Sequence, residues 1–268
     1  MADRYALFGH PVSHSRSPEI HHRFAELTGE SIRYELIDCP PQEFAATVRR
    51  FIEEGGRGGN ITLPHKQAAL SLCDVVSADA ERAGAVNTLA VLEDGRLFGD
   101  NTDGVGLVRD LTVNHGVVIS GRRVLVIGAG GAARGAIGAL LDEAPATLVI
   151  ANRTAAKAQA IAADFAAANL HSLEFEALNE AFDIIINATS ASLAGEVPEV
   201  PGVIIGAHTL AYDMFYANDA TAFLAWAKEQ GAARCLDGWG MMVEQAAESF
   251  FIWRGVRPDT SGLLERKA

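Results

Sequence analysis

One short segment constrains the fold of this chain more than any other, because it joins an apolar run, a glycine-rich turn and a helical pattern. Residues 124–127 are entirely apolar, and Gly128-Ala129-Gly130-Gly131-Ala132 follows them directly. Unbroken apolar runs are typical of strands buried on both faces of a parallel sheet. Glycines allow a tight turn there and let N–H groups of the next helix approach a pyrophosphate. The segment predicts a Rossmann-type domain that binds a dinucleotide; the alternative is a tight α/β turn without a cofactor.

The residues after the next strand indicate which dinucleotide is bound. Residues 148–150 form the predicted strand, and Asn152-Arg153-Thr154 follows it. Sites that prefer NAD usually place an acidic residue here to bind the ribose 2′-hydroxyl. This chain has no carboxylate there; Arg153 offers a charged fork for a 2′-phosphate, and Arg134 offers a second charge. Thr154 is expected to cap the following helix. The pattern favours NADP over NAD; the alternative is an exposed arginine at a helix start.

Strand and helix patterns alternate along the chain, which is typical of an α/β protein. In the first part we expect strands at 5–8, 32–37 and 60–63, a helix with Ser17 as its N-cap, a helix after Pro41 and a hairpin over 86–98. Farther along we expect strands at 124–127, 148–150 and 184–186, and helices to about 141, over 155–168 and over 241–251. The fold class is α/β: an N-terminal open α/β domain followed by a Rossmann-type, doubly wound nucleotide-binding domain.

The charge and composition of the chain exclude several classes of protein. Acidic residues number 34 against 22 basic ones, and this net charge of −12 disfavours a binder of nucleic acid. No apolar stretch is long enough to span a membrane, and the first residues lack the pattern of a signal peptide, so we expect a cytoplasmic protein. The histidines and the cysteines show no metal-binding spacing, and no metal is expected. Cys39, Cys73 and Cys235 are expected to be inert thiols.

Polar residues gather at the predicted strand ends of the N-terminal half, where open α/β sheets bind ligands. They lie in the segments 14–17, 60–66, 87–88 and 99–104. Serine hydroxyls can bind a carboxylate, and reduction of a ketone needs a proton donor near the oxygen that becomes an alcohol. Lys66 and Asp103 are a candidate acid–base pair for that purpose. Taken singly, such residues are more often a solvated lysine or a helix cap.

Together these motifs resemble the shikimate dehydrogenase family over nearly the whole chain. The resemblance rests on Ser15-Arg16-Ser17, Asn60-Ile61-Thr62-Leu63-Pro64-His65-Lys66, Ala85-Val86-Asn87-Thr88, Gly99-Asp100-Asn101-Thr102-Asp103-Gly104, Gly128-Ala129-Gly130-Gly131-Ala132, Asn152-Arg153-Thr154, Asn187-Ala188-Thr189-Ser190 and Asp237-Gly238-Trp239-Gly240-Met241. The family implies reversible reduction of 3-dehydroshikimate to shikimate with NADPH, in aromatic amino-acid biosynthesis. It implies a substrate-binding catalytic domain over 1–102, an NADP-binding domain over 103–237 and a C-terminal helix over 238–268 that returns to the first domain.

The resemblance also implies roles for individual residues. The catalytic pair would be Lys66 and Asp103. Substrate would be bound by Ser15, Ser17, Asn60, Thr62, Asn87, Tyr216 and Gln245. The cofactor would be bound by Gly128, Ala129, Gly130, Gly131, Ala132, Asn152, Arg153, Thr154, Thr189, Met214 and Gly238.

The chain departs from the family pattern at His65, where the family often has an aromatic or apolar residue. His65 could tune Lys66, but we expect it to be a surface residue. Two other functions stay open: a quinate/shikimate dehydrogenase of broader specificity, and a non-catalytic sensor that binds NADP. The expected partner is a small-molecule substrate, with no nucleic acid and no membrane, and the protein is expected to be a monomer or a homodimer.

Overall fold

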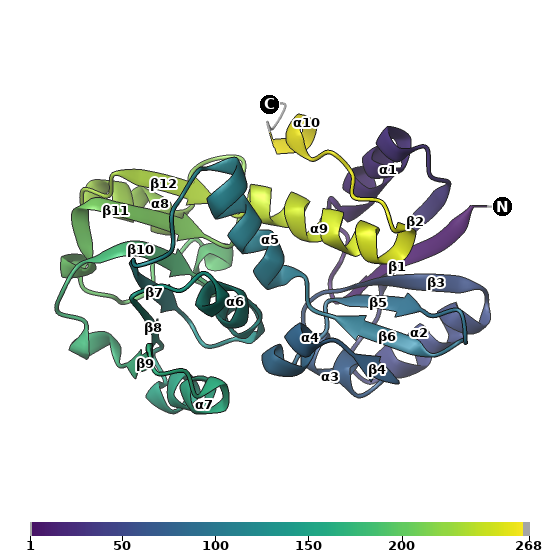
Figure 1. The fold of residues 1–268 in the computed structure, drawn as a ribbon, viewed down its shortest axis with the longest axis horizontal. Coiled ribbons are helices and arrows are strands. Elements are labelled where there is room, and N and C mark those ends of the chain that lie inside the picture. The colour runs from purple at the N-terminus through teal and green to yellow at the C-terminus, as the bar shows by residue number, and fades with distance from the viewer. Residues whose placement is uncertain (1, 265–268) are drawn as a thin grey trace. The chain divides into compact units, whose positions relative to one another are not determined.

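In the computed structural model, which describes residues 2–264, the chain forms two compact units (Figure 1). The first unit contains the chain up to Gly106 and the segment that starts at Val243. The second unit is Leu107–Met242. Helix α5 (Asp103–Arg109) begins in the first unit and ends in the second, and helix α9 (Trp239–Arg254) begins in the second and ends in the first.

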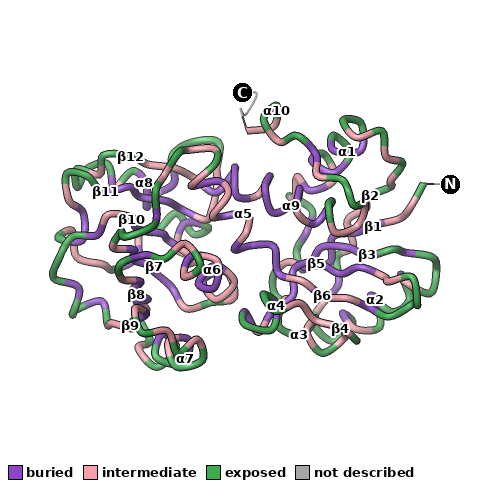
Figure 2. The backbone as a smooth tube through the Cα atoms, viewed as in Figure 1, coloured by how far each residue is buried: buried purple, intermediate pink, exposed green. Residues whose placement is uncertain are grey.

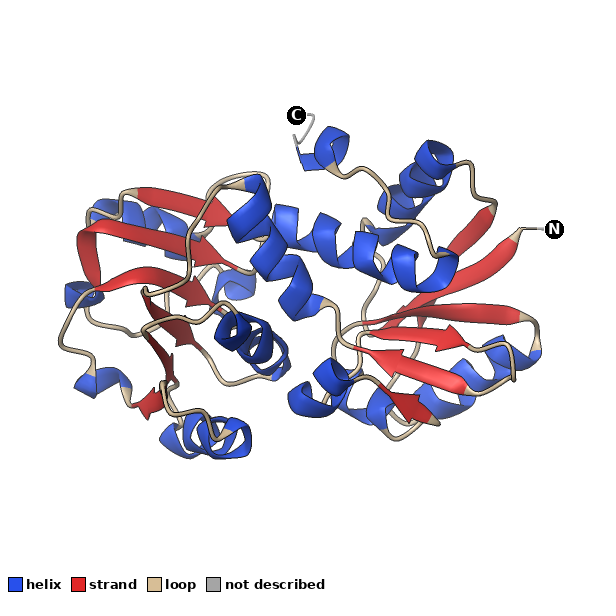
Figure 3. Cartoon of the chain, viewed as in Figure 1, coloured by secondary structure: helices blue, strands red, loops and turns tan. Residues whose placement is uncertain are grey.

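The first unit is built on a mixed sheet of six strands in the order β2-β1-β3-β5-β6-β4 (Figure 3). Its strands are β1 (Asp3–Gly9), β2 (Ile32–Asp38), β3 (Gly56–Ile61), β4 (Val75–Val76), β5 (Thr88–Val91) and β6 (Leu97–Asp100). Strands β1, β2 and β3 are parallel, whereas β5 is antiparallel to both β3 and β6. The expected hairpin over 86–98 is therefore confirmed as β5 and β6.

Helices cover both faces of this sheet because successive strand residues point to opposite faces. On one face, Ala6 and Phe8 of β1 pack with Phe44, Val48 and Phe51 of α2. On the other face, Tyr5 and Leu7 pack with Trp253 of α9. The helices that belong wholly to this unit are α1 (Ser17–Thr28), α2 (Phe44–Glu53), α3 (Lys66–Leu70), α4 (Ala78–Ala83) and α10 (Ser261–Leu264).

The second unit is a fully parallel sheet in the order β12-β11-β10-β7-β8-β9, which is the Rossmann strand order. Its strands are β7 (Arg123–Ile127), β8 (Thr147–Ala151), β9 (Leu170–Leu173), β10 (Phe182–Asn187), β11 (Ile205–Asp213) and β12 (Arg234–Asp237). Figure 2 shows that the residues of the inner strands β7, β8 and β10 are mostly buried, as their apolar sequences require. The doubly wound fold expected from the glycine turn is confirmed.

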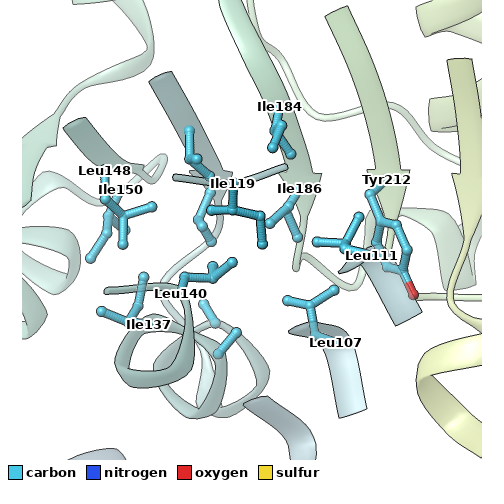
Figure 4. Close-up of a cluster of buried hydrophobic side chains, with 14 of the residues drawn as sticks. Leu107, Leu111, Ile119, Ile137, Leu140, Leu148, Ile150, Ile184, Ile186 and Tyr212 are labelled. Atoms are coloured by element: carbon cyan, nitrogen blue, oxygen red, sulfur yellow. The ribbon is translucent and has the colours of Figure 1, made fainter. Parts of the chain in front are cut away.

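Two separate apolar clusters form on the two faces of this parallel sheet. One contains Val124, Ile150 and Ile186 with α6 (Gly131–Asp142) and α7 (Ala155–Phe165), and Figure 4 shows Ile137 and Leu140 of α6 directed at the strand residues. The other contains Leu125, Val149 and Ile185 with α8 (Ala222–Glu229). Short helical turns complete the connections: the π-helix η1 (Asp110–Asn114) and the 3₁₀ turns η2 (Phe175–Ala177), η3 (Ala191–Ala194) and η4 (Gly202–Ile204).

Several local expectations are wrong in detail. Strand β3 begins at Gly56 rather than Asn60, and the three glycines at its start hid its strand pattern. Ser17 is the first helical residue of α1 rather than its N-cap, and it makes no cap bond. Thr154 is the N-cap residue of α7, but its side chain accepts no hydrogen bond from that helix. Among the described residues, no helix is long and apolar enough to cross a membrane.

Candidate active site

Lys66 and Asp103 form an ion pair in the first unit. The Lys66 Nζ lies 2.6 Å from Asp103 Oδ2, and the two side chains are 19% and 7% exposed. Lys66 is the first residue of α3, just after β3, and Asp103 is the first residue of α5, just after β6. The fold therefore brings together two residues that are far apart in the sequence, as the sequence predicts for an acid–base pair.

Asn87 fixes the orientation of the Asp103 carboxylate. Its Nδ2 donates to Asp103 Oδ1 at 2.8 Å, while its Oδ1 accepts from the Thr102 N–H and from the Thr88 hydroxyl, both at 2.9 Å. The acceptor end of the amide is thus committed to Thr102 and Thr88, and only the donor end can face Asp103. Both Asp103 oxygens accept hydrogen bonds, one from Asn87 and the other from Lys66.

The antiparallel strand β5 explains why these residues meet at one edge of the sheet. Thr88, where β5 begins, pairs with Asn60 near the end of β3 and with Asp100 at the end of β6. An antiparallel strand begins at the edge where its neighbours end. The sequence predicts a hairpin here, and the reversal of direction brings the start of β5 to the edge where β3 and β6 end.

Asn60 is buried, and both ends of its amide are bonded inside the first unit. Its Oδ1 accepts from the Tyr34 hydroxyl at 2.9 Å and contacts His21 Nε2 at 3.1 Å. Its Nδ2 donates to the Ser249 hydroxyl at 2.9 Å and, at 3.3 Å, to Thr88. Tyr34, His21 and Ser249 are not among the residues expected from the sequence, and each comes from an element distant in the chain. These bonds suit a residue that positions its neighbours.

The other expected substrate ligands of this unit are partly brought together. Ser15 donates to the Ser17 hydroxyl at 3.0 Å and accepts from the Ser17 N–H at 3.2 Å, so the two form one small polar group. Gln245 Oε1 lies 3.5 Å from Asn87 Nδ2, beside the Asp103 carboxylate. Thr62 follows β3, and its N–H donates to the Phe8 carbonyl at 2.9 Å.

The expectation that His65 is a surface residue is wrong. Its side chain is buried, stacked on the Phe44 ring with centroids 4.4 Å apart, and its Nε2 lies 2.8 Å from the Cys39 carbonyl oxygen. The ring of His65 is buried because it stacks flat on an aromatic side chain. The segment that carries Lys66 is thereby anchored to α2.

In the second unit, the glycine turn leaves room for a ligand at the start of α6. Gly128 has a φ of +114°, which favours glycine, and a Cβ there would lie 3.0 Å from the Ala188 carbonyl oxygen. A Cβ on Gly130 or Gly131 would meet no heavy atom within 4 Å. The first N–H groups of a helix have no partner within it, so they can bind a pyrophosphate. Ala129 and Ala132 are only partly buried in the same turn. The turn therefore fits a dinucleotide.

The segment after β8 presents cationic side chains. Arg153 and Thr154 are exposed, and the Asn152 side-chain amide donates to the Thr154 carbonyl at 2.9 Å, which holds the turn. Lys157, in the first turn of α7, is also exposed, and its place four residues after Arg153 could have identified it from the sequence. Arg134, expected as a second charge, pairs with Asp164 at 2.6 Å.

Three loops of the second unit carry the remaining expected residues. Thr189 follows β10 and donates its hydroxyl to Asn187 Oδ1 at 2.7 Å. Met214 follows β11, and Gly238 follows β12, where a Cβ would lie 2.2 Å from the Met214 carbonyl oxygen. Tyr216 lies in the loop after β11, edge-to-face on the Trp239 ring. No group of three or more His, Cys, Asp or Glu residues that could hold a metal exists among residues 2–264.

The Rossmann strand order, the open glycine turn and the Lys66–Asp103 pair together define the class as a nucleotide-dependent dehydrogenase. Family models match most of the chain: the shikimate dehydrogenase substrate binding domain at residues 7–89, shikimate / quinate 5-dehydrogenase at 112–194 and the shikimate 5′-dehydrogenase C-terminal domain at 238–265. The chain belongs to the shikimate dehydrogenase family.

Individual relatives are similar over almost their whole length. A shikimate dehydrogenase (NADP(+)) from Alkalilimnicola ehrlichii is 55% identical over 98% of both chains. The crystal structure of an Ael1 enzyme from Pseudomonas putida has a TM-score of 0.94 and 46% identity, covering 98% of this chain and 97% of that one. The shikimate 5-dehydrogenase from Thermus thermophilus, solved with NADP(H) and shikimate, has a TM-score of 0.87 and 35% identity, with 97% of each chain covered.

Proposed function

We propose that this protein is an NADP-dependent oxidoreductase that reversibly reduces 3-dehydroshikimate to shikimate in aromatic amino-acid biosynthesis. The observation that carries the proposal is the full-length match to relatives named shikimate dehydrogenase (NADP(+)), at 51–55% identity for three of them. We propose the first unit as the substrate-binding catalytic domain and the second as the NADP-binding domain, with functional limits near residues 102 and 237.

Lys66 is proposed as the group that moves the proton at the substrate oxygen. The hydride for the reduction comes from the nicotinamide of NADPH when that cofactor is bound, and the new alcohol oxygen also needs a proton. Asp103 is an acceptor at both oxygens, toward Asn87 and toward Lys66. It therefore holds the Lys66 side chain in place, and Lys66 gives a proton to the developing alkoxide and recovers it in the reverse direction.

The substrate ligands are proposed by their chemistry. Ser15 and Ser17 present two neighbouring hydroxyls for the carboxylate. Thr62 and Gln245 are proposed for the remaining oxygens, and Tyr216 of the second unit is proposed as a further ligand. Asn60 and Asn87 are proposed to act indirectly because their amides are already bonded, Asn60 to Tyr34 and Ser249 and Asn87 to Asp103 and Thr102.

The cofactor ligands are proposed to divide into three groups. Residues 128–132 bind the pyrophosphate through the start of α6. Arg153, with Asn152, Thr154 and Lys157, binds the 2′-phosphate. Thr189, Met214 and Gly238 border the nicotinamide.

An assay of the purified protein tests the function directly. Shikimate and quinate are each oxidised with NADP and with NAD, and the formation of reduced cofactor is followed by its absorbance. We expect the highest kcat/KM with shikimate and NADP. Comparable turnover of quinate with NAD would favour the broader quinate/shikimate dehydrogenase, and NADP binding without turnover would favour a sensor.

We also propose that the protein works in the cytoplasm. Its cysteines, Cys39, Cys73 and Cys235, are free thiols, as is usual in a reducing compartment. Burial raises the pKa of each thiol, which suits inert structural residues.

A further inference from the structure

Asp213 is a buried carboxylate in the second unit that none of the proposed steps uses. It is the last residue of β11 and is fully buried. Its Oδ2 accepts from the Ser192 hydroxyl at 2.5 Å and from the Thr221 hydroxyl at 2.6 Å. Its Oδ1 accepts from the Asn187 amide at 3.2 Å and from the Phe215 N–H at 3.1 Å. An ionised carboxylate accepts all four bonds, which offset part of the cost of burying it. Burial still raises the pKa of Asp213.

The donors to Asp213 come from separate segments at the carboxyl edge of the sheet. Asn187 ends β10, and Ser192 belongs to the turn η3 that follows it. Phe215 lies in the loop after β11, and Thr221 is the N-cap of α8. One carboxylate therefore fixes where β10 ends, how the loop after β11 leaves the sheet and where α8 begins.

The segments bonded to Asp213 carry or contact all three residues proposed to border the nicotinamide. Thr189 lies in the segment after β10, Met214 lies in the loop after β11, and Gly238 contacts that loop. Asn187 Oδ1 accepts from both the N–H and the hydroxyl of Thr189, at 3.2 and 2.7 Å, so its amide relays the orientation of Asp213 to Thr189. Met214 is held by its N–H, which donates to the Asn187 carbonyl at 3.0 Å. The Gly238 N–H donates to the Phe215 carbonyl at 3.1 Å.

We propose that Asp213 is a positioning residue that holds the loops bearing Thr189, Met214 and Gly238 in the arrangement that binds the nicotinamide half of NADP. This inference rests on the proposed function, because that function supplies the ligand. It assigns Asp213 no contact with the cofactor. It predicts that the nicotinamide half and the adenosine half of the cofactor depend on different residues.

Binding of whole and partial cofactor tests this role. NADP carries both halves, whereas adenosine 2′,5′-diphosphate carries only the half proposed for Arg153. Dissociation constants for both ligands are measured by calorimetry for wild type, Asp213→Asn, Thr221→Val and Thr221→Ser. Asp213→Asn keeps the shape but turns one acceptor oxygen into a donor facing Ser192 and Thr221 or Asn187. Thr221→Val removes one donor, and Thr221→Ser restores it.

Thr209→Val is the matched control. Thr209 lies in the middle of β11, is as buried as Asp213, and donates at 2.6 Å to the carbonyl of Phe182, the first residue of β10. Losing this bond destabilises the same pair of strands without touching the loops at issue. Thermal unfolding of each variant reports how far the fold itself is weakened.

We expect Asp213→Asn to raise the Kd for NADP about tenfold or more, the effect of losing a hydrogen bond to a buried charge. The Kd for adenosine 2′,5′-diphosphate should stay within about twofold. Thr221→Val should shift NADP binding in the same direction, Thr221→Ser should restore it, and Thr209→Val should lower the Tm alone.

Unchanged NADP binding in Asp213→Asn, an equal loss for both ligands, or an equal effect of Thr209→Val would overturn the inference. Should Asp213→Asn fail to fold, the comparison of Thr221→Val with Thr221→Ser decides. Wild-type protein that binds neither ligand would contradict the proposed function itself, so the two failures are distinguishable.

Discussion

At the scale of single residues, the geometry of the site depends on which atoms of each polar side chain are already hydrogen-bonded. The Asn87 amide has its oxygen bonded to Thr88 and Thr102, so its nitrogen must face Asp103. Asp103 then accepts at both oxygens and is suited to hold a cation, and we propose that Lys66 carries the transferable proton. The sequence identified the pair by residue type, but this division of roles follows only from the hydrogen bonds.

Replacing either member of the pair should reduce turnover. We expect Lys66→Met and Asp103→Asn each to lower kcat by about 10²–10⁴-fold, because proton transfer at the substrate oxygen is lost or its donor is no longer held. The Kd for NADP should change little, since both residues lie in the other unit. Steady-state kinetics and cofactor titration measure the two effects. Lys228→Met, an exposed change on α8, is the control; near wild-type kcat in Lys66→Met would reject its assignment.

Cofactor preference should depend on Arg153. A charge-assisted hydrogen bond to a phosphate is worth about 1.5–3 kcal/mol, and about 1.4 kcal/mol is a factor of ten. Arg153→Ala should therefore raise the KM for NADP at least tenfold and leave the KM for NAD nearly unchanged. Arg122→Ala removes an equally exposed charge just before β7, at the opposite edge of the sheet, and should alter neither value. Equal losses for both cofactors in Arg153→Ala would mean a general structural role.

At the scale of elements, local patterns predicted the strands of the first unit more completely than those of the second: β4 was missed in the first unit, and β9, β11 and β12 were missed in the second. The apolar runs of β7, β8 and β10 are short and continuous, so their strands were recognised within about one or two residues. Strand β11 was missed because Gly206 and His208 interrupt its apolar run. In the first unit, the local hairpin predicts that β5 is antiparallel to β6, but the antiparallel pairing of β5 with β3 joins strands distant in the sequence, and no local pattern encodes it. The buried place of His65 likewise depends on Phe44 of another helix.

The π-helix η1 at the end of α5 depends on a buried polar contact. The Tyr212 hydroxyl donates to Asp110 Oδ2 at 2.7 Å, and both side chains are fully buried (Figure 4 shows Tyr212 beside Leu111). Tyr212→Phe should leave that buried oxygen without this donor and destabilise the protein by about 1–3 kcal/mol. Urea unfolding measures the change. Tyr5→Phe is the control, because its hydroxyl has only a 3.4 Å contact with Arg254. A Tyr212→Phe loss no larger than that of Tyr5→Phe would contradict the argument.

At the scale of the whole molecule, hydrogen bonds and ion pairs join the N-terminal segment to helix α9 within the first unit. Asn60 bonds to Ser249 of α9, and Arg254 pairs with Glu30 near the end of α1. Sequence motifs could place Lys66, Asp103 and Gln245 on a shared site by resemblance. They could not reveal the buried network of Asn60, because each partner is an ordinary residue whose role depends on contacts between distant segments. His21 is one such partner.

His21 should make the stability of the folded protein depend on pH. Burial lowers the pKa of His21 from 6.5 to about 3. Its ring stacks on Tyr34, and its Nδ1 is buried with no hydrogen-bond partner in the part of the chain that the structure describes. The unfolded chain therefore binds a proton to this group at a higher pH than the folded protein does. The stabilisation is complete above the unfolded pKa, is lost as the pH falls below 6.5, and stops changing near the folded value.

Between pH 7 and pH 5 this one group should cost about 2 kcal/mol of the free energy of unfolding. Urea unfolding of wild type and His21→Phe at both pH values measures the effect, because phenylalanine keeps the stacked ring and cannot titrate. We expect the decline from pH 7 to pH 5 to be smaller in His21→Phe by about that amount. His22→Gln removes the adjacent but exposed histidine and should decline like wild type. If His21→Phe lost as much stability as wild type over this interval, the assignment of His21 as a neutral, buried ring bonded to Asn60 would be wrong.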